Sequence, residues 1–268
     1  MYAFDLGNRA RSVNPLRFLQ SASVFYHDAE GYESPTKDPR FSRLLGAFRR
    51  DYATPPEQMA PLLPDVIRRL MDEFWKEDTD AHISKWRTLF IAVISFHSAA
   101  RFSDLVHLTR DSISFDESKK VLFIHFGLSK TNRFRAHDKI DVIHASSSKY
   151  CPVAFTRAYL RRLQETLLLP PDSPLLPNSA SAGKTVISYS AALKAFRAIL
   201  SAVGEDAETY GLHSGRIGAH YVMQKAGLSD IVRRHKGRYG LNSTMPDYYT
   251  RFSPRWEETL ATSRALTV

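Results

Sequence analysis

The sequence predicts a mainly α-helical protein with a small antiparallel β-sheet, an α+β fold. Apolar residues recur at the spacing of amphipathic helices through most of the 268 residues. Two short runs rich in β-branched and aromatic residues, 121–126 and 139–143, flank a polar segment and are typical of the strands of a hairpin. Hydrophobic residues make up 43% of the chain, which is enough to fill a packed core.

The first part of the chain, residues 1–63, is expected to be a partial helical domain. Residues 39–52 place apolar side chains on one helical face and arginines on the others, so this helix can pack on a core while its basic face meets phosphates or water. We expect only one or two helices before Pro55. The proline-containing segments 54–57 and 61–64 interrupt the pattern and are expected to link this region to a second domain, residues 64–268.

Helical periodicity in the second domain alternates with the hairpin. Helices are predicted, in chain order, over residues 65–75, 83–100, 152–168, 188–203, 213–226 and 229–234. A further turn or short helix begins at Asp104. The polar tip of the hairpin, residues 129–138, places Lys130 near the turn. The Pro- and Ser-rich residues 169–183 predict a loop.

The charge balance favours a polyanionic partner. The chain has 37 Lys and Arg against 28 Asp and Glu, a formal net charge of +9 and an isoelectric point near 9.6. It has neither an apolar run long enough for a transmembrane helix nor the apolar segment of a signal peptide, so nucleic acid outranks a membrane. The lone Cys151 excludes an intramolecular disulfide and a cysteine zinc cluster. We expect an intracellular, DNA-associated protein, nuclear in a eukaryote or in the cytoplasm and nucleoid of a bacterium.

Several segments carry candidate functional residues. In Leu212-His213-Ser214-Gly215-Arg216, a histidine and an arginine stand three positions apart on one helical face. Two cations on one face suit an oxyanion with several oxygens, and a phosphodiester is the obvious candidate. Upstream stand Arg101 and Lys130, and downstream stand Tyr248 and Tyr249.

Taken in this order, these residues resemble the tyrosine recombinase (phage integrase) family. The family pattern is Arg-x-x-(Glu/Asp)-Leu, a β-hairpin lysine, His-x-x-Arg, a His or Trp, and a tyrosine. The matching residues are Arg101 with Asp104-Leu105, Lys130, His213 with Arg216, and Tyr249. The resemblance covers about residues 35–260. It implies the tyrosine recombinase catalytic fold for the second domain and a partial DNA clamp for the first. Within the family, the chain most resembles the versions encoded by eukaryotic mobile elements and related bacterial ones.

The resemblance implies a role for each matching residue. Arg101 and Arg216 would clamp the phosphate, because the planar guanidinium matches phosphate oxygens in a bidentate way. Asp104 would orient the Arg101 guanidinium from behind, or stand as a carboxylate at a helix N-terminus. Lys130 would protonate the leaving 5′ oxygen, and His213 would deprotonate the tyrosine or donate to the phosphate.

Two adjacent tyrosines compete for the role of nucleophile. In relatives the nucleophile stands six residues after a serine and is followed by x-Arg or x-His; Ser243 and the ending Thr250-Arg251 fit Tyr249 and not Tyr248. Attack on phosphorus would leave a 3′-phosphotyrosyl bond that keeps the energy of the cleaved linkage. At the family's His or Trp position the chain has Tyr239, which can pack against the nucleophile's helix and hydrogen-bond a phosphate oxygen.

The sequence therefore predicts a DNA strand transferase, a site-specific recombinase or integrase of a mobile element. No metal or cofactor is expected, because no cluster of carboxylates, histidines or cysteines stands at ligand spacing. The expected partner is double-stranded DNA, bound by a homotetramer on paired sites, since in the family the tail after the nucleophile docks on a neighbouring subunit. Two alternatives stay open: an inactive DNA-binding relative, and a type IB topoisomerase-like enzyme that relaxes supercoils without choosing a site.

Overall fold

The chain forms two compact units, Met1–Gln58 and Met59–Val268. The computed structural model describes residues 2–52, 59–76, 83–127, 139–167, 170, 172–178 and 185–239. The division falls ahead of the expected boundary at residue 63, because Leu62 is fully buried in the core of the second unit. Its backbone N–H donates to the carbonyl of Ser214 at 2.9 Å. The segment 61–64, expected to be a linker, is therefore part of the second unit.

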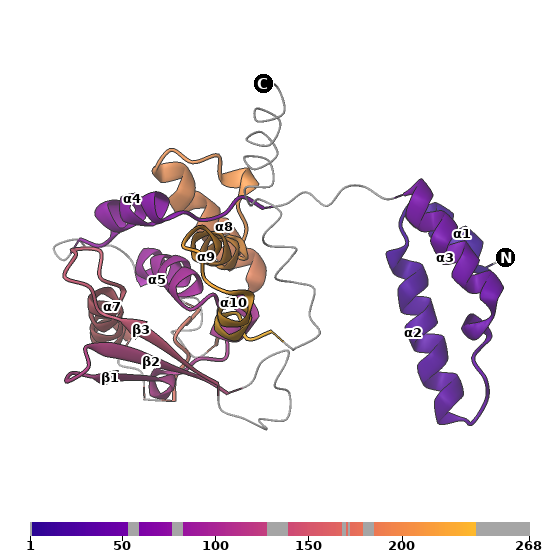
Figure 1. The fold of residues 1–268 in the computed structure, drawn as a ribbon, viewed down its shortest axis with the longest axis horizontal. Coiled ribbons are helices and arrows are strands. Elements are labelled where there is room, and N and C mark those ends of the chain that lie inside the picture. The colour runs from indigo at the N-terminus through magenta and orange to yellow at the C-terminus, as the bar shows by residue number, and fades with distance from the viewer. Residues whose placement is uncertain are drawn as a thin grey trace, which may run out of the picture. The chain divides into compact units, whose positions relative to one another are not determined.

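The first unit contains three α-helices within its described residues, more than the one or two predicted. They are α1 (Tyr2–Ala10), α2 (Asn14–Ala29) and α3 (Pro39–Asp51), with a 3-10 turn, η1 (Pro35–Lys37), before the last (Figure 1). A proline in the first turn of α2 marks its start, since proline is favoured there.

Helix α3 confirms the amphipathic helix predicted over residues 39–52. The side chain of Asp38 caps it by accepting the N–H of Arg40 at 2.7 Å. Leu45 and Phe48 on its inner face are buried against Leu16 of α2. The arginines on its other faces are exposed: Arg40, Arg43, Arg49 and Arg50.

The second unit is built around α5 (Ile83–His97), which is buried along most of its length. It packs against α4 (Pro64–Phe74), α7 (Pro152–Leu167), α8 (Tyr189–Ala202) and α9 (Ser214–Lys225) (Figure 1). An apolar sequence on every face of α5 suits this central position. The helices predicted over these residues are confirmed.

Helix α5 ends at His97 and not near residue 100 as predicted. Ala99 has φ 47°, in the left-handed region, so the helix cannot continue through it. The chain turns there and begins the short α6 (Phe102–Leu105), for which Arg101 is the N-cap residue. The turn therefore fixes the position of Arg101.

A three-stranded antiparallel sheet lies on one side of the second unit, in the order β1-β2-β3. β1 (Ile113–Asp116) pairs with β2 (Val121–Phe126), and β2 pairs with β3 (Lys139–His144). β2 and β3 confirm the predicted hairpin strands, whereas β1 was not predicted. The register places Ile124 opposite Asp141, so this carboxylate comes from the edge strand of the sheet.

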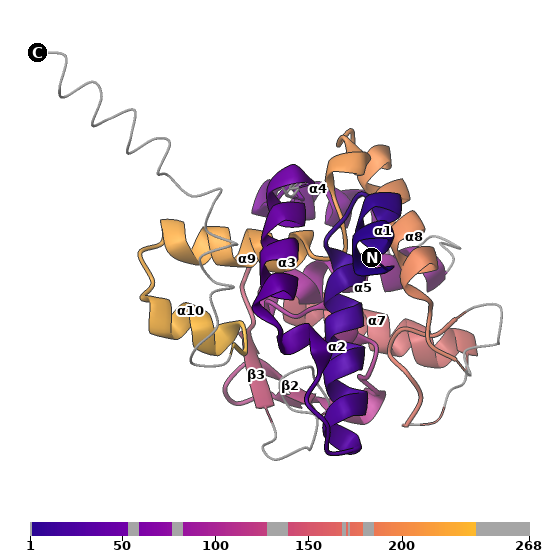
Figure 2. The ribbon, with the colours of Figure 1, turned by 90° about the vertical axis from the view of Figure 1, so that its right-hand side faces the viewer.

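Short elements complete the second unit: η2 (Arg110–Ser112), η4 (Ala207–Thr209) and α10 (Asp230–Lys236). Figure 2 shows α10 following α9, with the end of α10 beside β3. Within the described part of the chain, no helix combines the length and apolar character needed to cross a bilayer.

Candidate active site

Five of the residues singled out in the sequence come together in the second unit: Arg101, Asp104, His213, Arg216 and Tyr239. The Cζ atom of Arg216 lies 4.2 Å from the centre of the Tyr239 ring, and that of Arg101 lies 5.6 Å from it. Arg101 and Asp104 form an ion pair, and besides burial the charges of both, with that of Arg216, shift the pKa of His213. Residues from α6, α9 and the end of the described chain thus share one site.

Three other predicted residues belong to segments outside the described ranges. Lys130, the nucleophile Tyr249 and its competitor Tyr248 lie outside the residues that the structure describes. Their roles stay predictions.

Arg216 is fully buried, and three acceptors among the described residues hold its guanidinium. Its Nη1 donates to the carbonyl of Ala99 at 2.5 Å, its Nη2 to the carbonyl of Gly237 at 2.6 Å, and its Nε to the hydroxyl of Tyr239 at 2.9 Å. These acceptors are neutral, so they fix the guanidinium without cancelling its charge. A cation oriented in this way is suited to binding an anion.

Two glycines allow α9 to carry Arg216 into this position. A Cβ atom on Gly215 would lie 2.0 Å from Oγ of Ser95 in α5, and one on Gly218 would lie 1.9 Å from the carbonyl oxygen of Leu62. At Gly218 the neighbour is backbone, so only glycine permits this approach, whereas at Gly215 a Cβ atom would collide with the side chain of Ser95. The glycine inside the His-x-x-Arg segment thus has a packing role.

Arg101 and Asp104 lie at the start of α6. The carboxylate accepts the backbone N–H of Arg101 at 3.0 Å, and its Oδ2 lies 3.9 Å from the Arg101 Nη1, which is an ion pair but too long for a hydrogen bond. Asp104 is 1% exposed, whereas the Arg101 side chain is 13% exposed. The carboxylate therefore caps the start of α6 and forms an ion pair with the guanidinium, and its role in orienting Arg101 stays a prediction.

Sequence reasoning missed Arg238. This buried side chain donates from Nη1 to the carbonyl of Ser98 at 3.0 Å and pairs with Asp104 at 3.7 Å and Asp141 at 3.6 Å. Burial lowers its pKa to about 10, against the opposite effect of the two carboxylates. Its position beside Tyr239 was the only available signal, because neither carboxylate is near it in sequence.

Strand β3 is tied to α10 through Asp141. Its Oδ1 lies 2.6 Å from Nζ of Lys236, and burial raises its pKa even though Lys236 and Arg238 act to lower it. Strand β3, which follows the hairpin tip, is thereby joined to Lys236 and, through the ion pair of Asp141, to Arg238.

His213 is the N-cap residue of α9, with an exposed side chain. Partial removal of the ring from water by neighbouring protein atoms lowers the pKa of His213, and the positive charges of Arg216 and Arg101 lower it further. Asp104 acts in the opposite direction. The imidazole is therefore neutral near pH 7 and can accept a proton.

His220 is a second histidine of the site. It is fully buried, one helical turn after Arg216, and its Nε2 lies 3.1 Å from the hydroxyl of Tyr239. Burial and then the charge of Arg216 lower its pKa to about 3.

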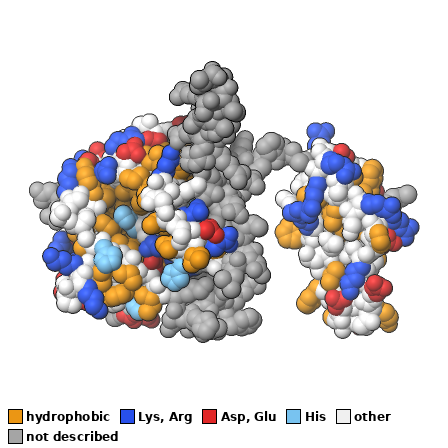
Figure 3. Space-filling view, viewed as in Figure 1, with side chains coloured by type: hydrophobic (Ala, Val, Ile, Leu, Met, Phe, Trp, Pro, Cys, Tyr) orange, Lys and Arg blue, Asp and Glu red, His pale blue; other side chains and the backbone are white. Residues whose placement is uncertain are grey.

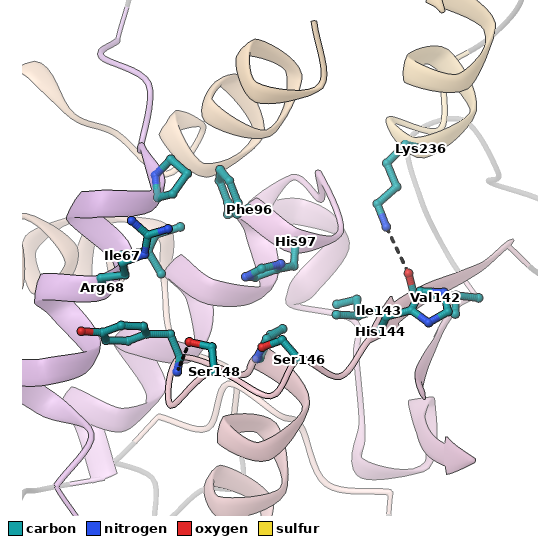
Figure 4. A pocket seen from close by; sticks show the side chains of 13 residues that line it. Ile67, Arg68, Phe96, His97, Val142, Ile143, His144, Ser146, Ser148 and Lys236 are labelled. Carbon is teal, nitrogen blue, oxygen red and sulfur yellow. Dashed lines mark hydrogen bonds between the residues drawn. The ribbon is translucent and has the colours of Figure 1, made fainter. Parts of the chain in front are cut away.

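A pocket of about 420 Å³ lies beside the site, between α4, α5, β3 and the end of α10 (Figure 4). Lys236 reaches across to the carbonyl of Val142, and Arg68, His97 and His144 also line it. Figure 3 shows histidines among hydrophobic side chains on this face of the second unit. The five residues of the candidate site do not line this pocket. Within the described ranges, no three His, Cys, Asp or Glu side chains are grouped to hold a metal ion.

The fold is that of the tyrosine recombinases. No family model and no curated protein matches the sequence. Among solved structures, the chain is similar to a XerH site-specific recombinase bound to a palindromic difH substrate (TM-score 0.56, 15% identity, 75% of this chain, 52% of that one). It is also similar to the XerA recombinase, with a TM-score of 0.54 and 16% identity over 93% of this chain and 82% of that one. A third similar structure is the Tn1549 transposon integrase in complex with circular intermediate DNA, with a TM-score of 0.56 and 17% identity over 96% of this chain and 82% of that one. The chain spans about half of the XerH chain that it matches.

Proposed function

We propose that this chain is a site-specific DNA recombinase or integrase that cuts and rejoins DNA through a 3′-phosphotyrosyl intermediate. One observation carries the proposal: in a tyrosine recombinase fold, Arg101 and Arg216 meet at the ring of Tyr239. Arg216 reaches the carbonyl of Ala99, 117 positions away in sequence. This proximity of two arginines supports the proposal that they bind the phosphate together.

The two arginines stabilise the transition state of phosphoryl transfer. Attack on phosphorus builds negative charge on the equatorial oxygens, and fixed cations aimed at those oxygens lower its energy. Because Arg216 is already held by three protein acceptors, little reorganisation is needed at the moment of reaction. Arg101, which is partly exposed, is the cation that can meet the DNA from the surface.

Two further groups move protons in the proposed reaction. His213, neutral near pH 7, accepts the phenol proton of Tyr249 as the phenol oxygen attacks phosphorus. Lys130 gives a proton to the 5′ oxygen as its bond to phosphorus breaks. The reverse attack by a 5′ hydroxyl restores the DNA and the tyrosine, so neither ATP nor a metal ion is required.

The first unit has the proposed role of a partial DNA clamp, and residues 64–268 that of the catalytic domain. The exposed arginines of α3 support this role, since Lys and Arg contacts to phosphates supply most non-specific DNA affinity. Figure 3 shows Lys and Arg side chains over the visible face of this unit. We also propose a homotetramer on paired DNA sites, in which the tail after Tyr249 docks on a neighbouring subunit, and an origin in a mobile element.

Covalent capture of nicked DNA tests the proposal. A pool of duplexes with a nick in a randomised sequence lets the protein select its site, and the short fragment beyond the cleaved bond diffuses away, so the phosphotyrosyl adduct accumulates. The wild-type protein should form an adduct that survives SDS, with or without EDTA, and the captured duplexes should share a sequence. Tyr249→Phe, which removes one oxygen, is the matched control and should bind the pool without forming the adduct.

Other results would assign the chain to a different class. Capture without a shared sequence, together with relaxation of supercoiled plasmid, would indicate a type IB topoisomerase-like enzyme. Binding without capture would indicate an inactive DNA-binding relative. Loss of capture in EDTA would indicate metal-dependent chemistry.

A further inference from the structure

The hydroxyl of Tyr239 lies between two side chains. Nε of Arg216 is 2.9 Å from the hydroxyl oxygen, and Nε2 of His220 is 3.1 Å from it on the other side. The arginine side chain has only N–H donors, so the phenol oxygen must accept this hydrogen bond. The phenol has one proton of its own, and its direction decides what Tyr239 can do in the reaction.

The surroundings of His220 favour a ring nitrogen that accepts. The ring is fully buried, and the positive charges of Arg216, Arg233, Arg101 and Arg238 act together with burial to keep it neutral. A neutral imidazole has one donor and one acceptor nitrogen. A phenol oxygen that accepts from a guanidinium becomes a stronger O–H donor, since hydrogen bonds in a chain polarise one another.

We propose that His220 is a positioning residue: its Nε2 accepts the Tyr239 hydroxyl proton, which turns the phenol oxygen to Arg216 and fixes the guanidinium for the phosphate. Tyr239 then has no proton left for a phosphate oxygen and acts on the DNA only through Arg216. This differs from the direct phosphate contact expected from the sequence. The catalytic part of the inference rests on the proposed function, whereas the direction of the hydrogen bond does not.

We call the hydrogen-bond chain from His220 through Tyr239 to Arg216 the relay. Single-turnover rates of covalent DNA capture distinguish the relay from a direct contact between Tyr239 and the phosphate. In the relay, His220→Leu and Tyr239→Phe should each lower the rate about ten- to a hundredfold, because a loosened guanidinium is misplaced in the transition state. The double variant should be no slower than the slower single variant, since both changes break one chain. If Tyr239 touches the phosphate itself, His220→Leu should leave the rate unchanged and only Tyr239→Phe should lower it, which would overturn the proposal.

Two matched variants exclude a merely structural role. His220→Gln keeps an acceptor oxygen near the place of Nε2, so its rate should stay within about threefold of wild type. Tyr221→Phe removes the same oxygen from the residue next to His220 and should also leave the rate unchanged. DNA affinity should be alike in all variants; a rate loss in His220→Gln equal to that in His220→Leu would contradict the relay.

The tautomer of His220 tests the hydrogen-bond direction without any activity. In the ¹⁵N-histidine-labelled full-length protein near pH 7, long-range proton–nitrogen correlation separates protonated from unprotonated ring nitrogens, and the His220 signals are those missing from His220→Gln. We expect the proton on Nδ1 and an unprotonated Nε2. A proton on Nε2 would overturn the proposal whether or not the protein captures DNA, whereas failure of capture with the proton on Nδ1 would count against the proposed function alone.

Discussion

Gly218→Ala should destabilise the second unit, although in an open helix interior the same change stabilises by about 0.5–1 kcal/mol. The new Cβ would lie 1.9 Å from the carbonyl oxygen of Leu62 and 2.8 Å from its carbonyl carbon. These are backbone atoms, so no side-chain rotation relieves the clash. Leu62 must retreat by about 1 Å to reach the 3.0 Å that real contacts keep.

The cost of this retreat has two parts. Overpacking of a filled core costs about 1–3 kcal/mol, and the hydrogen bond from Leu62 N–H to the Ser214 carbonyl, now 2.9 Å, is lost at about 1 kcal/mol. After the helix-propensity gain of about 0.5–1 kcal/mol, we expect a net loss of about 1–3.5 kcal/mol. For a unit of this size that corresponds to a fall in Tm of roughly 2–14 °C.

Urea unfolding followed by circular dichroism measures the change. Gly127→Ala is the control in the same unit, because no heavy atom of the described residues beyond its chain neighbours lies within 4 Å of its Cβ position. It should change stability by less than about 0.5 kcal/mol. An unfolding midpoint of Gly218→Ala equal to or above that of wild type would refute the close approach of α9 to Leu62.

Three further outcomes follow from the charges. Asp104→Ala should cost about 3 kcal/mol, because it leaves the buried Arg238 without one of its two carboxylates, whereas Glu117→Ala, which removes an exposed ion pair, should cost less than about 1 kcal/mol. Burial, and then the charge of Lys236, lower the pKa of His97 to about 4. The stability that the neutral His97 contributes is therefore present above pH 6.5 and is lost as the pH falls towards 4. His97→Gln should flatten this part of the pH–stability curve measured by urea unfolding. DNA affinity measured by fluorescence anisotropy should fall linearly in log salt, by about a thousandfold between 50 and 200 mM if about six phosphates are contacted, and a flat response would contradict DNA as the partner.

Much of the fold was predictable because its signals are local. The helices α3, α7 and α8 repeat apolar residues at helical spacing, and β2 and β3 are short β-branched runs around a polar tip. β1 escaped prediction because four residues with a serine and an aspartate carry too short a pattern, and its pairing with β2 supplies what its sequence lacks. The early end of α5 depends on the left-handed Ala99, which has no sequence signature.

The candidate site was predictable only in part. Arg101 and Arg216 could be matched because the family pattern fixes their order and spacing. Arg238 and His220 could not, since their partners come from distant segments: Asp104 and Asp141 for the arginine, Tyr239 for the histidine. Such contacts follow from tertiary packing, which a single sequence does not reveal.

The most direct test of the central claim is the identity of the residue that becomes linked to DNA. Peptide mapping by mass spectrometry of the captured adduct should find the phosphotyrosyl bond on Tyr249. Tyr249→Phe should abolish the adduct while leaving DNA affinity nearly unchanged, and Tyr248→Phe should keep it, because the spacing from Ser243 assigns the nucleophile to Tyr249. An adduct on Tyr248 or Tyr239, or on no tyrosine at all, would contradict the assignment.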